Sequence, residues 1–455
     1  MSSDAGIRFF HSVGSLPGWL GRHVPSRQLL LILAFVTGLA AGAGAFLLKR
    51  MIAWVSDWFT DRLAVSHANW ELLLLPVVGI LLAALFQRYI IRREIYHGVD
   101  RLNADLCGKK YVLPFSQMFT PMIASSVTLG FGGSAGSEGP IAYAGAAMGS
   151  NVGKCFGVPT DMMRVLVACG AAAGIAGIFK APIGGAFFAL ECLYVELASV
   201  AIIALIVAAV TAGLTAYLLS GCTPDIYFSS SVPFDMHWLP WVIAAGLFFG
   251  LYSIYYQLVM TRMARFYASI RNHWLKNIMA GAIIGAAIFL FPPLYGEGYG
   301  VISDMLAEDM AALIPYGLFA RDRVDTGLVL LLSGGMMLVK AFATVSTTSG
   351  GGVAGDFAPS LFTGCIAGCF FAFAVNTLPG IALPVGYFAF FGMAAVIAAT
   401  QRAPLMAIFL TVEMGAAYTL LLPVTVVATV SYFVFRLGGR RFGISNPIRP
   451  SDQNE

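Results

Sequence analysis

Long apolar runs alternate with short polar connections along almost the whole chain. The runs at 29–48 and 72–86 are nearly free of charge and are long enough, or nearly so, to cross a bilayer, since a crossing helix needs about 20 apolar residues. Further apolar stretches, several interrupted by glycine and proline, cover 111–131, 162–190, 198–219, 238–258, 278–291, 326–345, 358–375, 387–400 and 420–435. The pattern predicts one large all-α integral membrane domain.

Composition and charge agree with a multi-pass membrane protein. Of the 455 residues, 58% are hydrophobic and 11% are charged, whereas soluble domains carry roughly 25% charged residues. The balance of 27 basic and 23 acidic residues excludes a strongly anionic partner such as nucleic acid. Basic residues gather before the first apolar run and at the tail, so we expect both termini in the cytoplasm. As a separate expectation, we assign the protein to a bacterial inner membrane. No cofactor or metal is expected.

The chain contains an internal repeat in two registers. Residues 170–191 recur in 392–413 at an offset of 222, including a proline and a glutamate. Glycines and a proline of 132–149 recur in 351–368 at an offset of 219. Duplicated halves, each with a glycine-interrupted segment at the matching place, are typical of transporters whose broken helices meet near the middle of the membrane.

A polar segment at 221–236, with two prolines and three consecutive serines, separates the two halves. We therefore divide the chain into five parts. They are a cytoplasmic N-terminal segment at 1–27, a first membrane repeat at 28–220, an inter-repeat loop at 221–236, a second membrane repeat at 237–445 and a cytoplasmic tail at 446–455.

Each half carries a glycine-rich segment that leads into an apolar helix. The first half has GGSAGSEGP at 132–140, and the second has GGGVAGDFAP at 350–359. Proline suits the first turn of a helix, where its missing N–H would have no partner. The free N–H groups of two such helix starts, with the positive ends of the helix dipoles behind them, predict a binding site for a small anion.

Glu138 is the acidic residue of the first glycine-rich segment. An ionised carboxylate at membrane depth costs roughly 2.5 kcal/mol or more unless something compensates it. The amides that bind an anion can also bind this carboxylate. Glu138 is therefore predicted to compete with the anion and to leave on protonation, which links anion occupancy to proton uptake. The simpler interpretation is that Glu138 only caps its helix.

These segments resemble the filter motifs of the CLC family of chloride channels and proton-coupled chloride transporters. GSEGP at 136–140 is similar to Gly-Lys/Arg-Glu-Gly-Pro, and GDFAP at 355–359 is similar to Gly-x-Phe-x-Pro. The resemblance implies a CLC-like bundle of many tilted and broken helices in two inverted repeats, a homodimer in the bilayer, and a gating role for Glu138. It implies anion contacts from backbone amides near Ser137, Glu138, Gly139, Phe357 and Ala358.

The chain departs from the family pattern at several positions. His97 stands where a serine hydroxyl normally touches the central anion, so it is a candidate anion ligand or a solvated side chain. The family's inner proton-accepting glutamate falls at Cys192, and we expect Glu191 or Glu196 to substitute. Asp356 joins the candidate anion-site residues, although capping of its helix is the simpler role for a carboxylate there.

The sequence leaves several functions open. The first is exchange of a small inorganic anion, chloride above all, for protons. The second is a passive chloride channel, which the missing inner glutamate favours, and a fluoride-selective antiporter is a variant of the first. A different class, a serine hydrolase, is suggested by Gly-x-Ser-x-Gly around Ser134, but histidine and acid partners are not evident. We expect a transporter and no enzyme activity.

Overall fold

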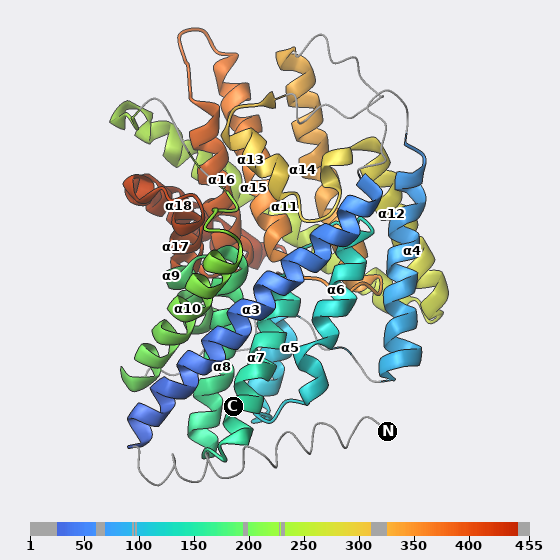
Figure 1. Ribbon diagram of the computed structural model, residues 1–455. Helices are drawn as coiled ribbons and strands as arrows, with labels where there is room; N and C mark the ends of the chain where they lie inside the picture. Colours follow the sequence, from blue (N-terminus) through green and yellow to red (C-terminus); the bar gives the residue numbers. More distant parts are fainter. Residues whose placement is uncertain are drawn as a thin grey trace.

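The computed structural model describes residues 25–60, 69–92, 95, 98–193, 199–226, 228, 233–310 and 325–444. Within these ranges the regular elements are helices, which confirms the all-α prediction (Figure 1). The first half contains α3 (Ser26–Thr60), α4 (Glu71–Leu85), α5 (Val99–Cys107), α6 (Thr120–Gly130), α7 (Glu138–Cys155), α8 (Thr160–Phe179), α9 (Pro182–Glu191) and α10 (Ser199–Leu219). The second half contains α11 (Leu239–Ser269), α12 (His273–Leu290), α13 (Tyr299–Leu306), α14 (Thr326–Ser349), α15 (Phe357–Asn376), α16 (Val385–Thr400), α17 (Pro404–Met414) and α18 (Leu421–Arg441).

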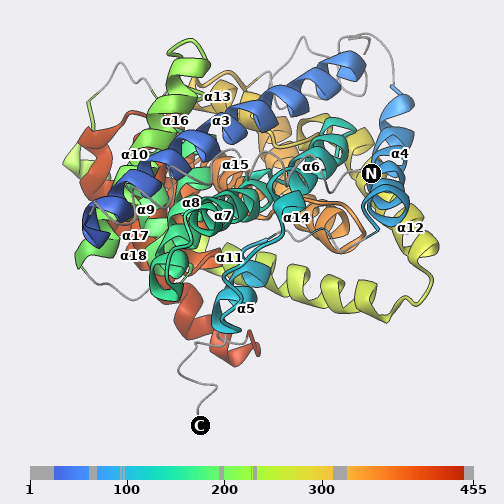
Figure 2. The same ribbon diagram turned by 60° about the horizontal axis from the view of Figure 1, so that its bottom comes forward.

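Nine helices in the described part of the chain are long and apolar enough to cross a membrane. The longest of them, α3, runs obliquely across the molecule, while α4 and α12 lie side by side at one edge (Figures 1 and 2). The core helices α8 and α16 are apolar on all sides because nearly every one of their side chains is buried. They pack against α7 and α15, the two helices that follow the glycine-rich segments.

Glycine crossings hold each half together in the same way. A Cβ atom on Gly145 of α7 would overlap the carbonyl oxygen of Gly170 of α8. The repeat relates this pair to Gly364 of α15 and Gly392 of α16, where the same overlap would occur. Small residues allow helix backbones to approach this closely in a membrane. The repeat read from the sequence therefore places the same contact twice in the structure.

The two halves meet along α9 and α17 with opposite directions. Glu191 at the end of α9 accepts hydrogen bonds from the backbone N–H groups of Leu405 and Met406 at the start of α17, at 3.3 and 2.8 Å. Glu413, its repeat partner, accepts from Ile183 and Gly184 at the start of α9, at 3.1 and 2.8 Å. Because each helix end lies beside the other helix's start, the two helices are antiparallel, as inverted repeats require.

Candidate functional site

The two glycine-rich loops pair with each other at the centre of the molecule. The N–H of Gly136 donates to the carbonyl of Gly355 at 2.9 Å, and the N–H of Gly355 donates to the carbonyl of Gly136 at 2.7 Å. Two threonines hold the loops from behind in matching ways: the hydroxyl oxygen of Thr347 accepts from Ser134 N–H, and that of Thr128 accepts from Val353 N–H. The repeat brings both helix starts to one place.

Three helices begin around this pairing, namely α5, α7 and α15. Gly98, which precedes α5, has a φ of 90°, a conformation that glycine adopts without strain. A Cβ atom on Gly139 would lie 3.2 Å from the Cα of Gly98 and 3.3 Å from the Cα of Gly355. Glycine at 139 therefore lets the helix starts approach without a tight Cβ contact. Their free N–H groups make the meeting point attractive to negative charge.

Glu138 occupies the meeting point. One oxygen of its carboxylate, Oε1, accepts hydrogen bonds from the N–H groups of Phe357 and Ala358 at 2.5 and 3.0 Å. The residue is 2% exposed, and its Oε2 atom has no hydrogen-bond partner within the part of the chain that the structure describes. The carboxylate thus binds the start of α15, in the other half of the chain, while one of its oxygens is left unsatisfied at a cost in free energy.

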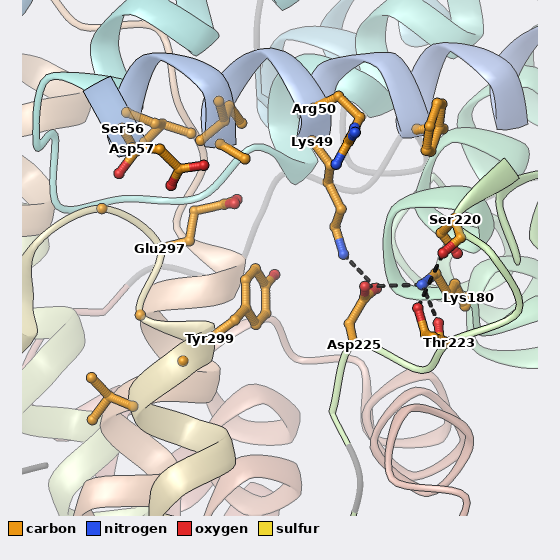
Figure 3. Close-up of a pocket in the computed structure, with 18 of the residues that line it drawn as sticks. Lys49, Arg50, Ser56, Asp57, Lys180, Ser220, Thr223, Asp225, Glu297 and Tyr299 are labelled. Atoms are coloured by element: carbon orange, nitrogen blue, oxygen red, sulfur yellow. Dashed lines mark hydrogen bonds and ion pairs between the residues drawn. The ribbon is translucent and has the colours of Figure 1, made fainter. Parts of the chain in front are cut away.

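Two cavities reach residues next to this point, one at Glu297 and the other at Gly98 and Gly355. The larger, which we call the Lys49 cavity, has a volume of about 890 Å³ and is lined by Lys49, Lys180, Asp225, Glu297 and Tyr299 among others (Figure 3). The smaller, the Arg402 cavity, has a volume of about 410 Å³. Its lining includes Gly98, Asp100, Glu191, Cys192, Asp356 and Arg402.

A basic residue stands at the same repeat position in each cavity. Lys180 and Arg402 both adopt a left-handed conformation, with φ values of 54° and 56°, directly before an Ala-Pro pair that begins the next helix. This conformation is uncommon outside glycine, asparagine and aspartate, so the surrounding fold must hold it. The duplication therefore places one basic side chain in the lining of each cavity.

Asp225 links two lysines across the Lys49 cavity. Its carboxylate accepts from Lys49 Nζ at 2.6 Å and from Lys180 Nζ at 2.9 Å (Figure 3). Burial pushes the pKa of Asp225 upward, but the two lysines outweigh burial and hold the pKa below its usual value. This carboxylate contributes stability above its ordinary pKa, and the contribution is lost as the pH falls through the lowered pKa of the folded state.

Asp225→Asn is expected to lower the free energy of unfolding by about 1 kcal/mol or less near neutral pH, since the pair is partly exposed. The difference from wild type should shrink as the pH falls below about 4, because the wild-type carboxylate then gains its own proton. Thermal melts of the purified protein in detergent at several pH values measure both effects. Asp57→Asn, which removes another carboxylate of the same cavity, is the control. Equal losses for both variants at every pH would contradict the assignment.

Two further ionisable residues reach the site from the second half. Glu297, in the connection between α12 and α13, accepts hydrogen bonds from the N–H of Ser137 at 2.9 Å and from the hydroxyl of Ser137 at 2.6 Å. Lys340 of α14 is fully buried, donates to the hydroxyl oxygen of Ser134 at 2.8 Å, and lies 4.7 Å from the ring centre of Phe362. The sequence analysis missed both residues. A lone lysine inside the apolar run 326–345 was the available signal, because intramembrane charges are rare.

The structure brings together most of the residues predicted for the site. Ser137, Glu138, Gly139, Phe357 and Ala358 meet at the paired loops. Asp356 precedes α15 and lines the Arg402 cavity, but it makes no side-chain capping hydrogen bond. Glu191 and Cys192 line the same cavity. His97 and Glu196 lie outside the described residues.

The arrangement around Ser134 gives no support to the serine hydrolase interpretation. Ser134 is fully buried, and its hydroxyl donates to the carbonyl of Leu294 at 2.5 Å. It lies in a loop between two helices, whereas the hydrolase motif needs an exposed turn from a strand to a helix. The hydroxyl serves to hold Lys340 and the loop in place.

Comparison with known proteins gives consistent matches over most of the chain. A family model described as voltage gated chloride channel matches residues 79–436. A protein of Ralstonia nicotianae named as a ClcB-like chloride channel protein is 29% identical over 418 residues, covering 87% of this chain and 92% of the relative. A Cronobacter sakazakii protein named H(+)/Cl(−) exchange transporter ClcA is 27% identical over 411 residues, covering 87% of this chain and 84% of the relative.

Two solved structures share the fold. The structure of a slow cyanobacterial Cl⁻/H⁺ antiporter matches with a TM-score of 0.73 at 24% sequence identity, covering 95% of this chain and all (100%) of that one. The structure of a CLC-type fluoride/proton antiporter matches with a TM-score of 0.71 at 24% identity, covering 90% of this chain and 96% of that one.

Proposed function

Because the chain belongs to the voltage-gated chloride channel (CLC) family, we propose that it exchanges a small inorganic anion for protons, with Glu138 as the gate. The observation that carries this proposal is the pair of hydrogen bonds that the Glu138 carboxylate accepts from Phe357 and Ala358. The carboxylate takes up N–H groups that would otherwise bind an anion, and each of two cavities is lined by residues that contact it or its neighbours. The chain is an integral multi-pass membrane protein with nine apolar spans among its described residues.

Competition for the same N–H groups couples the anion to the proton. An ionised carboxylate and a halide both need the donors at the start of α15, so one excludes the other. Protonation removes the negative charge from Glu138 and weakens its hold on Phe357 and Ala358. Linkage then requires that anion binding favour proton uptake by the same amount that protonation favours anion binding. The anion therefore crosses the membrane in one direction while the proton crosses in the other.

Chloride is the proposed anion. Two relatives carry chloride in their names, and one solved neighbour is a Cl⁻/H⁺ antiporter. Fluoride is the alternative, since another neighbour is a fluoride/proton antiporter. The filter proline Pro140 is retained here, which favours chloride. We place Ser137, Gly139, Phe357 and Ala358 around the anion through their backbone amides.

A passive chloride channel is the second candidate, because the proton has no evident carrier in the part of the chain that the structure describes on the side of the Arg402 cavity. Cys192 stands where the family has a glutamate. Among the described residues that line the Arg402 cavity, the carboxylates are those of Glu191, Asp100 and Asp356. Glu191 is engaged with the start of α17, which makes it a poor carrier unless that contact opens. We propose that water in the Arg402 cavity delivers the proton to Glu138.

We further propose the setting of the molecule. The Arg402 cavity faces the cytoplasm of a bacterium, and both termini lie on that side, as the clustered basic residues favour. The halves divide at 221–236, between α10 and α11. Two copies pair in the bilayer. Support comes from the exposed apolar side chains of Ile183, Leu405 and Leu422 around the α9–α17 contact.

Uphill proton movement tests the proposal. Purified protein in liposomes with an outward chloride gradient is expected to drive protons inward against their own gradient, because each departing anion is exchanged for a proton. A pH electrode in weakly buffered solution measures it, with protein-free liposomes as the blank. Chloride efflux without any uphill proton movement would assign the channel function instead.

A further inference from the structure

Glu297 occupies a second set of donors at the filter, on the Lys49 side. It is held between Gly296 and Gly298, whose φ values of 63° and 84° belong to the left-handed region. A Cβ atom on Gly298 would press on the ring of Phe362, so this backbone suits glycine alone. The conformation directs the carboxylate of Glu297 to the N–H and hydroxyl of Ser137, immediately before α7.

The two carboxylates therefore occupy backbone donors in both filter segments, one in each. Oε1 of Glu138 binds the N–H groups of Phe357 and Ala358 at the start of α15. Oε1 of Glu297 binds the N–H of Ser137 at the start of α7. While both carboxylates stay in place, an anion arriving through the Lys49 cavity finds neither set of donors free.

Among the residues that the structure describes, the Ser137–Glu297 contact has no counterpart in the other half. The loop pairing and the two threonine contacts each recur at an offset of 219 residues, so they belong to the duplicated scaffold. Ser137 corresponds to Asp356, which lines the Arg402 cavity. This contact therefore distinguishes the approach through the Lys49 cavity from the approach through the Arg402 cavity.

The surroundings of Glu297 are rich in charge. The titratable and charged groups that face it or share its cavity are Lys49, Arg50 and Asp57 of α3, Glu138 of α7, Lys180 after α8, Asp225 of the inter-repeat loop, Lys340 of α14, and the hydroxyls of Tyr295 and Tyr299.

Charge balance sets when the gate can open. Glu138, Glu297 and an incoming anion each bring negative charge to one place, where Lys340 and Lys49 are the cations that act on these carboxylates. Burial raises the pKa of Glu297, which lies outside the apolar spans, although the hydrogen bonds from Ser137 and the charge of Lys49 oppose the shift. Protonation of either carboxylate would lower the repulsion on an incoming anion and weaken that carboxylate's hold on its N–H donors.

We propose that Glu297 is a second gating carboxylate, which holds the Ser137 donors on the Lys49 side and must be neutralised before an anion gains the complete set. This inference rests on the exchange function proposed above and adds a residue to its gate. The proton that reaches Glu138 from the Lys49 cavity passes by way of Glu297, since Glu297 lines that cavity and binds Ser137, the residue directly before Glu138.

The pH profile of chloride flux through reconstituted protein tests the role of Glu297. Four proteins are compared from about pH 4 to about pH 9: wild type, Glu297→Gln, Glu138→Gln and the double variant. Wild-type flux should fall steeply with rising pH, because two carboxylates ionise. Each single variant should keep a shallower dependence, set by the remaining carboxylate, and the double variant should be flat. Glu297→Gln should pass chloride about tenfold faster than wild type at the alkaline end, since a hydrogen bond to a charged acceptor accounts for about that factor.

Controls separate gating from a structural role. Asp57→Asn removes a carboxylate from the same cavity and should keep the wild-type profile. Ser137→Ala removes the 2.6 Å contact to Glu297 and should shift the pH profile toward that of Glu297→Gln. If Glu297→Gln does not fold, Ser137→Ala tests the second gate in its place. A flat profile for Glu138→Gln alone, or an unchanged profile for Glu297→Gln or Ser137→Ala, overturns the second gate. Wild-type proton coupling in Glu138→Gln overturns the exchange function itself, whatever Glu297→Gln does.

Discussion

Glu138→Gln is expected to abolish proton movement while chloride still crosses the membrane. A glutamine side chain cannot take up or release a proton near neutral pH, and without its charge it competes weakly for the N–H groups of Phe357 and Ala358. In liposomes with a chloride gradient, proton flux should fall to the level of protein-free liposomes. Chloride flux, followed with a chloride electrode, should persist and lose most of its dependence on pH apart from the part that Glu297 controls.

Glu413→Gln is the matched control for this result. Glu413 also accepts two hydrogen bonds from N–H groups at a helix start, but it does so at the α9–α17 contact. The variant should be less stable and still drive protons uphill. If Glu138→Gln pumps protons at the wild-type ratio, or if Glu413→Gln loses coupling to the same extent, Glu138 is not the gate.

Gly364→Ala is expected to destabilise the protein and to reduce anion flux together. The new Cβ would overlap the carbonyl oxygen of Gly392, which belongs to backbone and cannot rotate away. Overpacking of this kind costs about 1–3 kcal/mol. Because α15 carries the Phe357 and Ala358 donors, a displacement of α15 from α16 also disturbs the anion site. Thermal unfolding in detergent and chloride flux in liposomes measure the two effects.

Gly300→Ala is the companion variant. Gly300 lies within α13, and a Cβ atom there would meet no atom within 4 Å. Alanine should therefore leave the flux unchanged and stabilise the helix by about 0.5–1 kcal/mol. Equal stability of Gly364→Ala and Gly300→Ala would mean that the close helix crossing does not limit the fold.

Much of the fold could be predicted because the relevant signals are local or repeated. Apolar runs mark the long helices, and proline after a break marks the starts of α9 and α17. The two registers of the repeat carry three-dimensional information, because equivalent residues make equivalent contacts. Gly145 with Gly170 and Gly364 with Gly392 show this most directly. The central residues of the site were predictable for the same reason, since each filter motif lies within a few residues of its helix start.

The remainder of the site could not be predicted because it depends on contacts between distant segments without a repeat partner. Glu297 reaches Ser137 across 160 positions, and Lys340 reaches Ser134 across 206. Neither pair is visible in a period or a motif. The sequence suggested capping of its own helix as the simpler role for Glu138 and gave no sign of the contacts with Phe357 and Ala358, which belong to α15. The direction in which the Glu138 side chain points depends on how the two repeats pack together, which the sequence alone does not specify.

The location of a heavy halide tests the central claim most directly. Crystals of the Glu138→Ala variant soaked in bromide should give an anomalous scattering peak within hydrogen-bond distance of the N–H groups of Phe357 and Ala358, where the wild-type carboxylate otherwise lies. Wild-type crystals at high pH should lack that peak. Bromide bound only elsewhere in the variant, with these two donors left to water, would contradict the account.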